Sequence, residues 1–234
     1  MLSDQRLMEL HVEALFTHDA SQRLLTVNEP HGNGALAPRF FLGRTQAGSV
    51  RRFRSDVPDP LVEQLEVLCA DEKTSGELLR KPQHFEKYIR LLQSHATIQE
   101  LWMGPAYRVP VEATPPAHAV GITDQNADLL RGGFEWLIPR IEDEQPCLAI
   151  VREGAAVSIC RSVRITSRAH EAGVETLDVF RRRGYASEVV IGWARAVHEM
   201  GCVPLFSTSW ENVLSQGVAR KLALALYGVT FHVK

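Results

Sequence analysis

The sequence predicts an α/β (α+β) fold in which a mixed sheet is flanked by helices, and two observations lead to this prediction. After residue 118 the segments run helix, strand, strand, strand, helix, strand, helix and strand, an order that gives a mixed sheet covered by helices. Before residue 112 amphipathic helical segments and short strands share one stretch of chain, which indicates a smaller α+β unit.

A proline-rich stretch marks the boundary between the two parts. Pro115-Pro116, within VEATPPAHA (111–119), resists both helix and strand, so we expect a linker there. The chain has 234 residues, which is enough for two domains with cores of their own. We therefore expect an N-terminal α+β accessory domain over residues 1–112 and a second domain over residues 113–234.

The first part is predicted to contain three helices. Over residues 3–16, apolar residues recur at three- and four-residue steps, as on the buried face of an amphipathic helix. A second helix begins at Asp59-Pro60, with Asp59 as its N-cap and proline at the first helical position. A third lies within 84–96. Strands are expected within 23–30, in a hairpin of 39–45 and 49–55, and within 98–110.

The second part is predicted to hold three helical segments between strands. A helical region covers 124–141 and is weakened at Gly132-Gly133, and helices follow over 187–200, which Gly201 ends, and over 213 to about 225. Strands are expected on both sides of a turn at Arg152-Glu153-Gly154, within 147–166, and over 173–179, 203–210 and 227–233.

Composition narrows the class of protein. The formal charge is −2, with 45% apolar and 23% charged residues, which is ordinary for a soluble globular protein and argues against attraction to nucleic acid or anionic membrane. The N-terminal residues carry charges where a signal peptide would be apolar, and no window reaches the roughly 18 to 20 apolar residues of a membrane helix. We therefore expect a cytoplasmic protein that binds neither nucleic acid nor membrane.

The four cysteines, Cys69, Cys147, Cys160 and Cys202, are widely spaced. They form no C-x-x-C pair, so they fit neither a zinc site nor a disulfide framework. The histidines, such as His11, show no metal-ligand spacing and are expected at the surface or in the core. We therefore expect reduced thiols and no metal.

The stretch FRRRGYASEVVIGWA (180–194) places three arginines and a Gly-x-Ala between a strand and a helix. Gly184 allows the backbone to approach a ligand closely, and Ala186 keeps that approach open. The unpaired amides of a first helical turn, together with the positive end of the helix dipole, form an anion site. Arg181 to Arg183 add charge suited to phosphate. Taken alone, the stretch is equally compatible with a solvated arginine run on an ordinary loop.

Other phosphate and nucleic-acid motifs do not fit this loop. The G-x-x-x-x-G-K-[ST] spacing of a P-loop is absent, and a Rossmann fingerprint would need three glycines and an acidic residue after a second strand. Nucleic-acid binding would call for more basic clusters, and RRFR (51–54) is the only other one.

Two motifs in the C-terminal half resemble the GNAT superfamily of acyl-CoA-dependent N-acyltransferases. Arg181-x-x-Gly184-x-Ala186 after a short strand matches its [Q/R]-x-x-G-x-[G/A] pyrophosphate loop. About 28 residues downstream, the run from Asn212 to Leu222 is similar to the N-x-x-S-x-x-V-A-x-K-L-G signature of one GNAT branch. The resemblance covers about residues 118–234 and leaves out the N-terminal half.

The resemblance implies a GNAT fold in which two neighbouring parallel strands splay apart and acetyl-CoA, the cosubstrate, lies between them. Main-chain groups of Val174, Glu175 and Thr176 would pair with pantetheine, an amide near Leu177 would serve the oxyanion, and 205–210 would form the second strand. The other residues implied to bind the cosubstrate are Arg181, Arg182, Arg183, Gly184, Tyr185, Ala186, Ser187, Asn212 and Ser215.

The implied activity is transfer of acetyl from acetyl-CoA to a small-molecule or peptide amine, by direct attack in a ternary complex. His170, Glu171 and Glu175 are the candidate bases, and a surface or hairpin-loop role is the alternative for each. The tyrosine acid of many GNAT enzymes is replaced by Ala219. Tyr227 is a candidate substitute, with packing as its alternative role.

The vacant tyrosine position keeps a second function open, that of a non-catalytic acyl-CoA-binding sensor. In either case the N-terminal domain is expected to shape the acceptor site or to serve as a scaffold. A homodimer is also compatible with the sequence.

Overall fold

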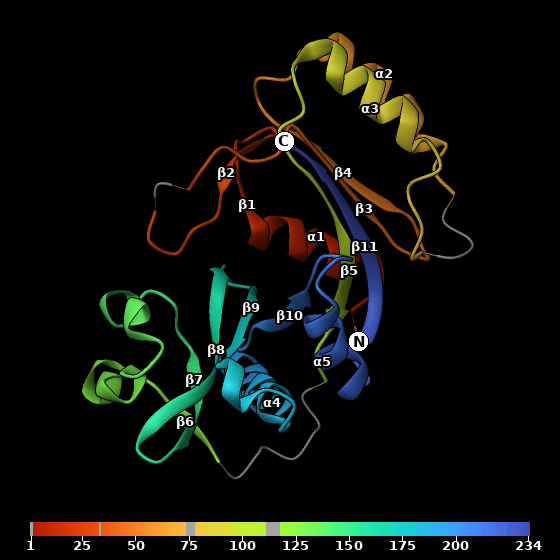
Figure 1. Cartoon of the computed structure of the whole chain (residues 1–234). Coiled ribbons are helices and arrows are strands. Elements are labelled where there is room, and N and C mark those ends of the chain that lie inside the picture. Colours follow the sequence, from red (N-terminus) through yellow and green to blue (C-terminus); the bar gives the residue numbers. More distant parts are fainter. Residues whose placement is uncertain (1, 33, 74–77, 111–117) are drawn as a thin grey trace.

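A nine-stranded mixed sheet organises the computed structural model (Figure 1). The structure describes residues 2–32, 34–73, 78–110 and 118–234, and the sheet belongs to these residues. β9 and β10 are parallel neighbours, whereas the other neighbouring strands are antiparallel. In spatial order the strands are β4 (Ser49–Phe53), β3 (Phe40–Arg44), β11 (Ala225–Val233), β5 (Leu101–Arg108), β10 (Val203–Ser207), β9 (Ala169–Thr176), β8 (Ala155–Ile165), β7 (Cys147–Arg152) and β6 (Ala119–Gly121).

Strands from both predicted parts share this sheet. β11 pairs with β3 along one edge and with β5 along the other, and β5 also pairs with β10. The sheet is therefore continuous across the two halves of the sequence. The predicted linker falls mostly on residues 111–117, outside the described residues, and the division into domains 1–112 and 113–234 remains a proposal.

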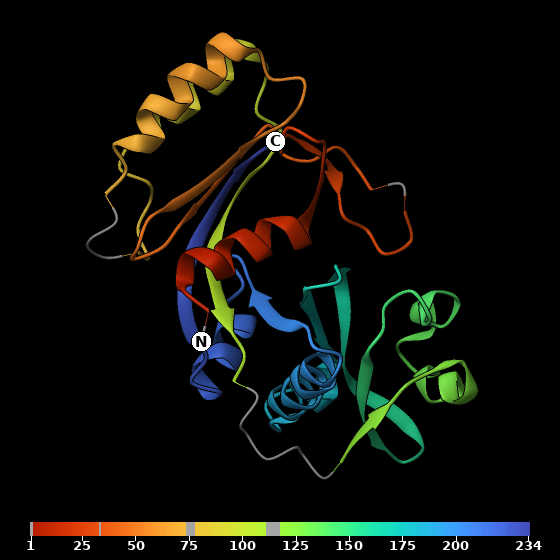
Figure 2. The same ribbon diagram turned by 180° about the vertical axis from the view of Figure 1, so that it is seen from behind.

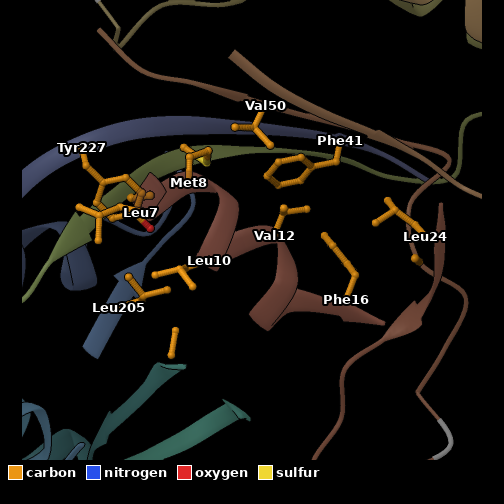
Figure 3. Close-up of a cluster of buried hydrophobic side chains, with 13 residues drawn as sticks. Leu7, Met8, Leu10, Val12, Phe16, Leu24, Phe41, Val50, Leu205 and Tyr227 are labelled. Carbon is orange, nitrogen blue, oxygen red and sulfur yellow. The ribbon is translucent and has the colours of Figure 1, made fainter. Parts of the chain in front are cut away.

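Helices cover both faces of the sheet. α1 (Asp4–Leu15) crosses one face over β9 and β11, as both views show (Figures 1 and 2). On the opposite face, α4 (Tyr185–Glu199) packs against β7 to β10, and α2 (Asp59–Ala70) and α3 (Phe85–His95) cover the β3–β4 end. Side chains that alternate along β3 identify the two faces of the sheet. Phe40 and Leu42 pack toward α2 and α3, whereas Phe41 packs toward α1 (Figure 3).

The predicted helices and strands are present, with differences at their ends. α1 begins at Asp4 because the Ser3 hydroxyl accepts a hydrogen bond from the Arg6 amide at 3.2 Å. The N-cap prediction for Asp59 is wrong, since Asp59 is the first residue of α2 and Pro58 is its cap. β1 (Phe16–His18) and β2 (Leu24–Val27) form a separate pair beside the sheet.

Several elements of the C-terminal half differ from their predicted bounds. β9 begins at Ala169, earlier than predicted, because its first residues pair with β10. α5 (Val213–Lys221) is shorter than predicted, because Ala223 turns the chain with φ 48° and β11 begins two residues later to pair with Arg108. The helical region over 124–141 consists of two 3-10 segments, η1 (Asp124–Leu130) and η2 (Glu135–Arg140), on either side of the predicted glycine break.

Candidate active site

β9 and β10 start as paired parallel neighbours and then separate. Their register covers Val203↔Ala169, Pro204↔His170 and Leu205↔Glu171 and ends there. β9 nevertheless continues to Thr176, so its last five residues pair only with β8 among the described strands. The two strands therefore form a V whose apex lies at Glu171.

The open edge of β9 presents main-chain groups to this V. The Leu177 amide donates to the Val157 carbonyl at 3.0 Å, on the β8 side. Because main-chain groups alternate between the two edges of a strand, those of Val174 and Thr176 point into the V. The Thr176 carbonyl accepts from Arg181 Nε at 3.3 Å, in keeping with this direction. The Leu177 amide itself is paired with β8, so the predicted oxyanion amide near Leu177 would have to come from a neighbouring residue.

The turn before α4 leaves the first amides of the helix without a side-chain cap. Gly184 is the N-cap, with φ 92° and ψ −8°, a conformation that suits glycine because it has no Cβ. The helix begins at Tyr185, earlier than predicted, so the amides of Tyr185 and Ala186 belong to its first turn and point outward. The helix dipole adds partial positive charge at this end. Fully buried Trp193 and Val190 hold the helix on the sheet.

Two of the three arginines in the loop make contacts within the loop. Arg181 forms an ion pair with Asp178 at 2.7 Å, and the Arg183 guanidinium lies over the Phe180 ring. Arg182 adopts the left-handed conformation, with φ 62°. The backbone amides are therefore the better-directed donors for an anion.

Helix α5 forms the opposite wall. Asn212 caps it, since the side-chain Oδ1 accepts from the Ser215 amide at 3.0 Å. The side chain of Lys221, at the other end of α5, extends to the loop before α4. Its Nζ would lie 2.9 Å from a Cβ added to Gly184. An ammonium group therefore stands directly at the glycine turn.

These walls enclose a cavity of about 740 Å³. Most predicted cosubstrate-binding residues line it, namely Val174, Glu175, Thr176, Leu177, Arg181, Arg182, Gly184, Tyr185, Ala186, Ser187, Asn212 and Ser215. Arg183, which was also predicted, is not among its lining residues. Of the base and acid candidates, only Glu175 lines it.

Glu171 sits at the apex of the V, on the α1 face. Its carboxylate bridges the two strands where their ladder ends, since Oε1 accepts from the Ser207 amide of β10 at 2.6 Å. The side chain is buried, and burial raises the pKa of Glu171 to about 7, although the Ser207 hydrogen bonds lower it in part. A carboxyl group that titrates near neutral pH is suited to accept a proton.

Of the other candidates, His170 and Glu175 have structural partners, and Tyr227 is buried away from the cavity. His170 is buried on the α4 face, where its Nδ1 is 2.9 Å from the Ser162 hydroxyl, and burial lowers its pKa. Glu175 is about half exposed and forms an ion pair with Arg161 at 3.1 Å. Tyr227 is buried under α1, and burial together with the nearby Glu171 raises its pKa. The hairpin-loop alternative for His170 and Glu171 is wrong, because both lie in β9.

The splayed pair β9 and β10 and the glycine turn before α4 lie beside one cavity, as the resemblance implies. No family model and no curated protein matches the sequence. Within the described residues no helix is long and apolar enough to span a membrane, and no group of three or more His, Cys, Asp or Glu side chains could hold a metal ion.

Several solved structures similar to this chain are described as acetyltransferases. A protein assigned to the GNAT family from Novosphingobium aromaticivorans is 13% identical over 58% of this chain and 65% of its own, with a TM-score of 0.49. The chain thus spans just under two thirds of that protein. A GCN5-related N-acetyltransferase from Kribbella flavida is 14% identical over 100% of this chain and 96% of its own, with a TM-score of 0.49.

A third similar structure is an aminoglycoside N-acetyltransferase, AAC(6′)-Iy, in complex with CoA. It is 20% identical over 44% of this chain and 84% of its own, with a TM-score of 0.35. Each of these TM-scores is below 0.5, so the similarity does not assign a function to this chain.

The sequence motifs missed several residues that line the cavity. Gly133 and Phe134 come from the glycine break between η1 and η2, which carried no ligand signal in the sequence. Lys221 belongs to the motif of residues 212–222, but that motif did not predict that it lines the cavity. Its position two residues before the left-handed turn at Ala223 gave no sign that it reaches Gly184.

Replacing Lys221 with alanine is expected to weaken CoA binding about fivefold, because one exposed cation next to a phosphate contributes on the order of 1 kcal/mol. Isothermal titration of CoA measures this, and the effect should shrink at high salt. Arg220→Ala is the matched control, since it removes the same charge from the same helical turn outside the cavity. Equal losses in the two variants would contradict a direct role for Lys221.

Proposed function

We propose that the chain is an N-acetyltransferase that transfers acetyl from acetyl-CoA to an amine by direct attack in a ternary complex. The observation that carries this is the V between β9 and β10, which opens into a cavity bordered by the uncapped N-terminus of α4. An extended pantetheine arm would pair with the main-chain groups of Val174 and Thr176. The pyrophosphate would then lie on the amides of Tyr185 and Ala186, beside Lys221.

Glu171 is the base in this proposal. The acceptor nitrogen attacks the thioester carbonyl, its N–H bond breaks, and the proton passes to the Glu171 carboxylate. The C–S bond breaks with its electron pair on sulfur, the thiolate takes up a proton from solvent, and Glu171 then releases its proton to solvent, so that amide and CoA thiol are formed. Of the three candidate bases, Glu171 alone is buried at the apex and has a pKa raised toward neutrality.

The acceptor would approach from the α1 face. A second cavity of about 250 Å³ lies there, bordered by Ser207, whose amide holds Glu171, and by Arg164, the strand partner of Glu171. Phe16, Val27 and other residues of the N-terminal half supply its apolar wall. Its size and lining favour a small amine on an apolar body over a peptide or a long polyamine.

Acetyl-CoA at one hundred times its Kd is expected to stabilise the folded state by about 2.7 kcal/mol, because a ligand that binds only the folded form shifts the equilibrium by mass action. Thermal unfolding in the presence of acetyl-CoA or CoA measures this gain in stability, with adenosine, which lacks pyrophosphate and pantetheine, as the comparison. Absence of any shift with acetyl-CoA and CoA would contradict both the enzyme and the sensor.

Thiol release on a panel of amines separates those two functions. We expect release with small arylalkyl or alkyl amines and little with lysine-containing peptides. The sensor is the second candidate, because the position of the usual acid is the buried Ala219. Stabilisation by acetyl-CoA without thiol release on any amine would favour it.

A further inference from the structure

A cluster of buried polar side chains lies under α1, outside the CoA cavity. It consists of His11 from α1, Glu171 from β9 and Tyr227 from β11, whose exposed fractions are 0%, 4% and 2%. His11 Nε2 is 3.5 Å from Glu171 Oε2, and the rings of His11 and Tyr227 meet edge to face with centroids 6.0 Å apart. Tyr227 lies at the α1 N-terminal end of the surrounding apolar core (Figure 3).

Several polar atoms of this cluster have no hydrogen-bond partner among the described residues. They are both ring nitrogens of His11, Oε2 of Glu171 and the hydroxyl of Tyr227. Buried polar groups are normally paired, so such a concentration marks a site retained for something other than packing. Packing alone would favour an apolar residue at position 11, since its helix neighbours Leu10 and Val12 belong to the apolar core.

The charge state of His11 allows its ring to act as a hydrogen-bond donor. Burial lowers the pKa of His11 to about 3, so the ring is neutral and carries one N–H. The 3.5 Å separation is the outer limit of a hydrogen bond, and catalytic hydrogen bonds are often long before substrate binds. With the Ser207 amide on Oε1, an N–H at Nε2 would give each carboxylate oxygen one donor.

The other groups that face this pair do not take over that role. Tyr227 stays protonated, because burial and the nearby Glu171 raise its pKa. Arg164 on β8 acts on Glu171 through its charge, and its guanidinium is ion-paired with Glu29. His232 on β11 lies near His11, and burial lowers its pKa to about 3, so it is neutral as well.

We propose that His11 is a positioning residue for proton transfer: its Nε2–H donates to Glu171 Oε2 and stabilises the carboxylate that takes the proton of the acceptor. This inference rests on the proposed function, in which Glu171 is the base. His11 itself stays neutral throughout, and the proton that leaves the nitrogen of the acceptor resides on Glu171. The first half of the chain thereby supplies a residue to the chemistry of the second half.

The test compares His11→Leu with His11→Gln. Leucine fills the site without a donor, whereas the glutamine amide places an N–H close to the position of Nε2. We expect His11→Leu to raise the midpoint of the Glu171 carboxyl titration by about one pH unit, as loss of one hydrogen bond to a charged group would, and His11→Gln to leave it nearly unchanged. Carbon-13 NMR of labelled glutamate follows the titration, and Glu171→Gln assigns the signal.

The same variants should move the acid limb of kcat by the same amount. The midpoint staying in place in a folded His11→Leu protein would overturn the inference, even if kcat fell equally at every pH. Should His11→Leu fail to fold, His11→Asn replaces it, because its shorter amide does not reach the Nε2 position. The NMR titration needs no substrate, so it distinguishes failure of this inference from failure of the transferase proposal.

Discussion

Gly184→Trp is expected to abolish CoA binding, with a loss of affinity of about 100-fold or more. Gly184 has φ 92°, a region that side chains with a Cβ rarely adopt, and any added Cβ would meet Lys221 Nζ at 2.9 Å. The indole would occupy the space in which the pyrophosphate meets the amides of Tyr185 and Ala186. Loss of about two hydrogen bonds to a charged group accounts for the expected magnitude. Isothermal titration of CoA and acetyl-CoA is the measurement.

Gly201→Trp is the matched control. Gly201 follows the opposite end of the same helix with φ 79°, and a Cβ there meets no atom within 4 Å. Both variants therefore carry backbone strain at an end of α4, but only Gly184→Trp fills the cavity. Retained CoA affinity in Gly184→Trp, or equal losses in both variants, would refute the assignment of the pyrophosphate to this turn.

Glu171→Gln is expected to lower kcat by about 10² to 10⁴, the usual contribution of a general base. CoA affinity should stay within about twofold, because Glu171 is not among the residues that line the CoA cavity. Steady-state kinetics with saturating acetyl-CoA measures the first effect, and isothermal titration measures the second. Glu175→Gln is the matched control, since this carboxylate lines the cavity but is half exposed and paired with Arg161. A larger loss in Glu175→Gln would contradict the choice of base.

The pH dependence follows from the same group. Because burial raises the pKa of Glu171 to about 7, the carboxylate that accepts a proton forms only above that pH, and kcat should fall as the pH drops through it. The folded state also favours the protonated form, so this contribution to stability is present at acidic pH and is lost as the pH rises through about 7. Both dependences should vanish in Glu171→Gln.

Local patterns in the sequence predicted the elements and the loop. The Gly-x-Ala turn and the apolar repeat of the following helix are contained in fifteen consecutive residues, so backbone geometry at Gly184 follows from chemistry nearby in the chain. The mixed sheet flanked by helices is confirmed, and the composition of most of its strands predicted them; β6, at the end of the predicted linker, was not predicted.

Strand pairing and the surroundings of the base could not be predicted in this way. The insertion of β5 between β11 and β10 depends on pairings of residues about one hundred positions apart or more, which no local periodicity in the sequence indicates. Glu171, His11 and Tyr227 meet only because α1 crosses the apex of the V. From the sequence, His11 was predicted to be an ordinary surface or core residue, because Glu171 and Tyr227 are far from it along the chain.

A crystal structure of the protein with CoA tests the central claim most directly. We predict the pyrophosphate within hydrogen-bond distance of the amides of Tyr185 and Ala186, the pantetheine arm paired with Val174 in the V, and the thiol directed toward Glu171. CoA bound elsewhere on the chain, with the Gly184 turn unoccupied, would contradict the account.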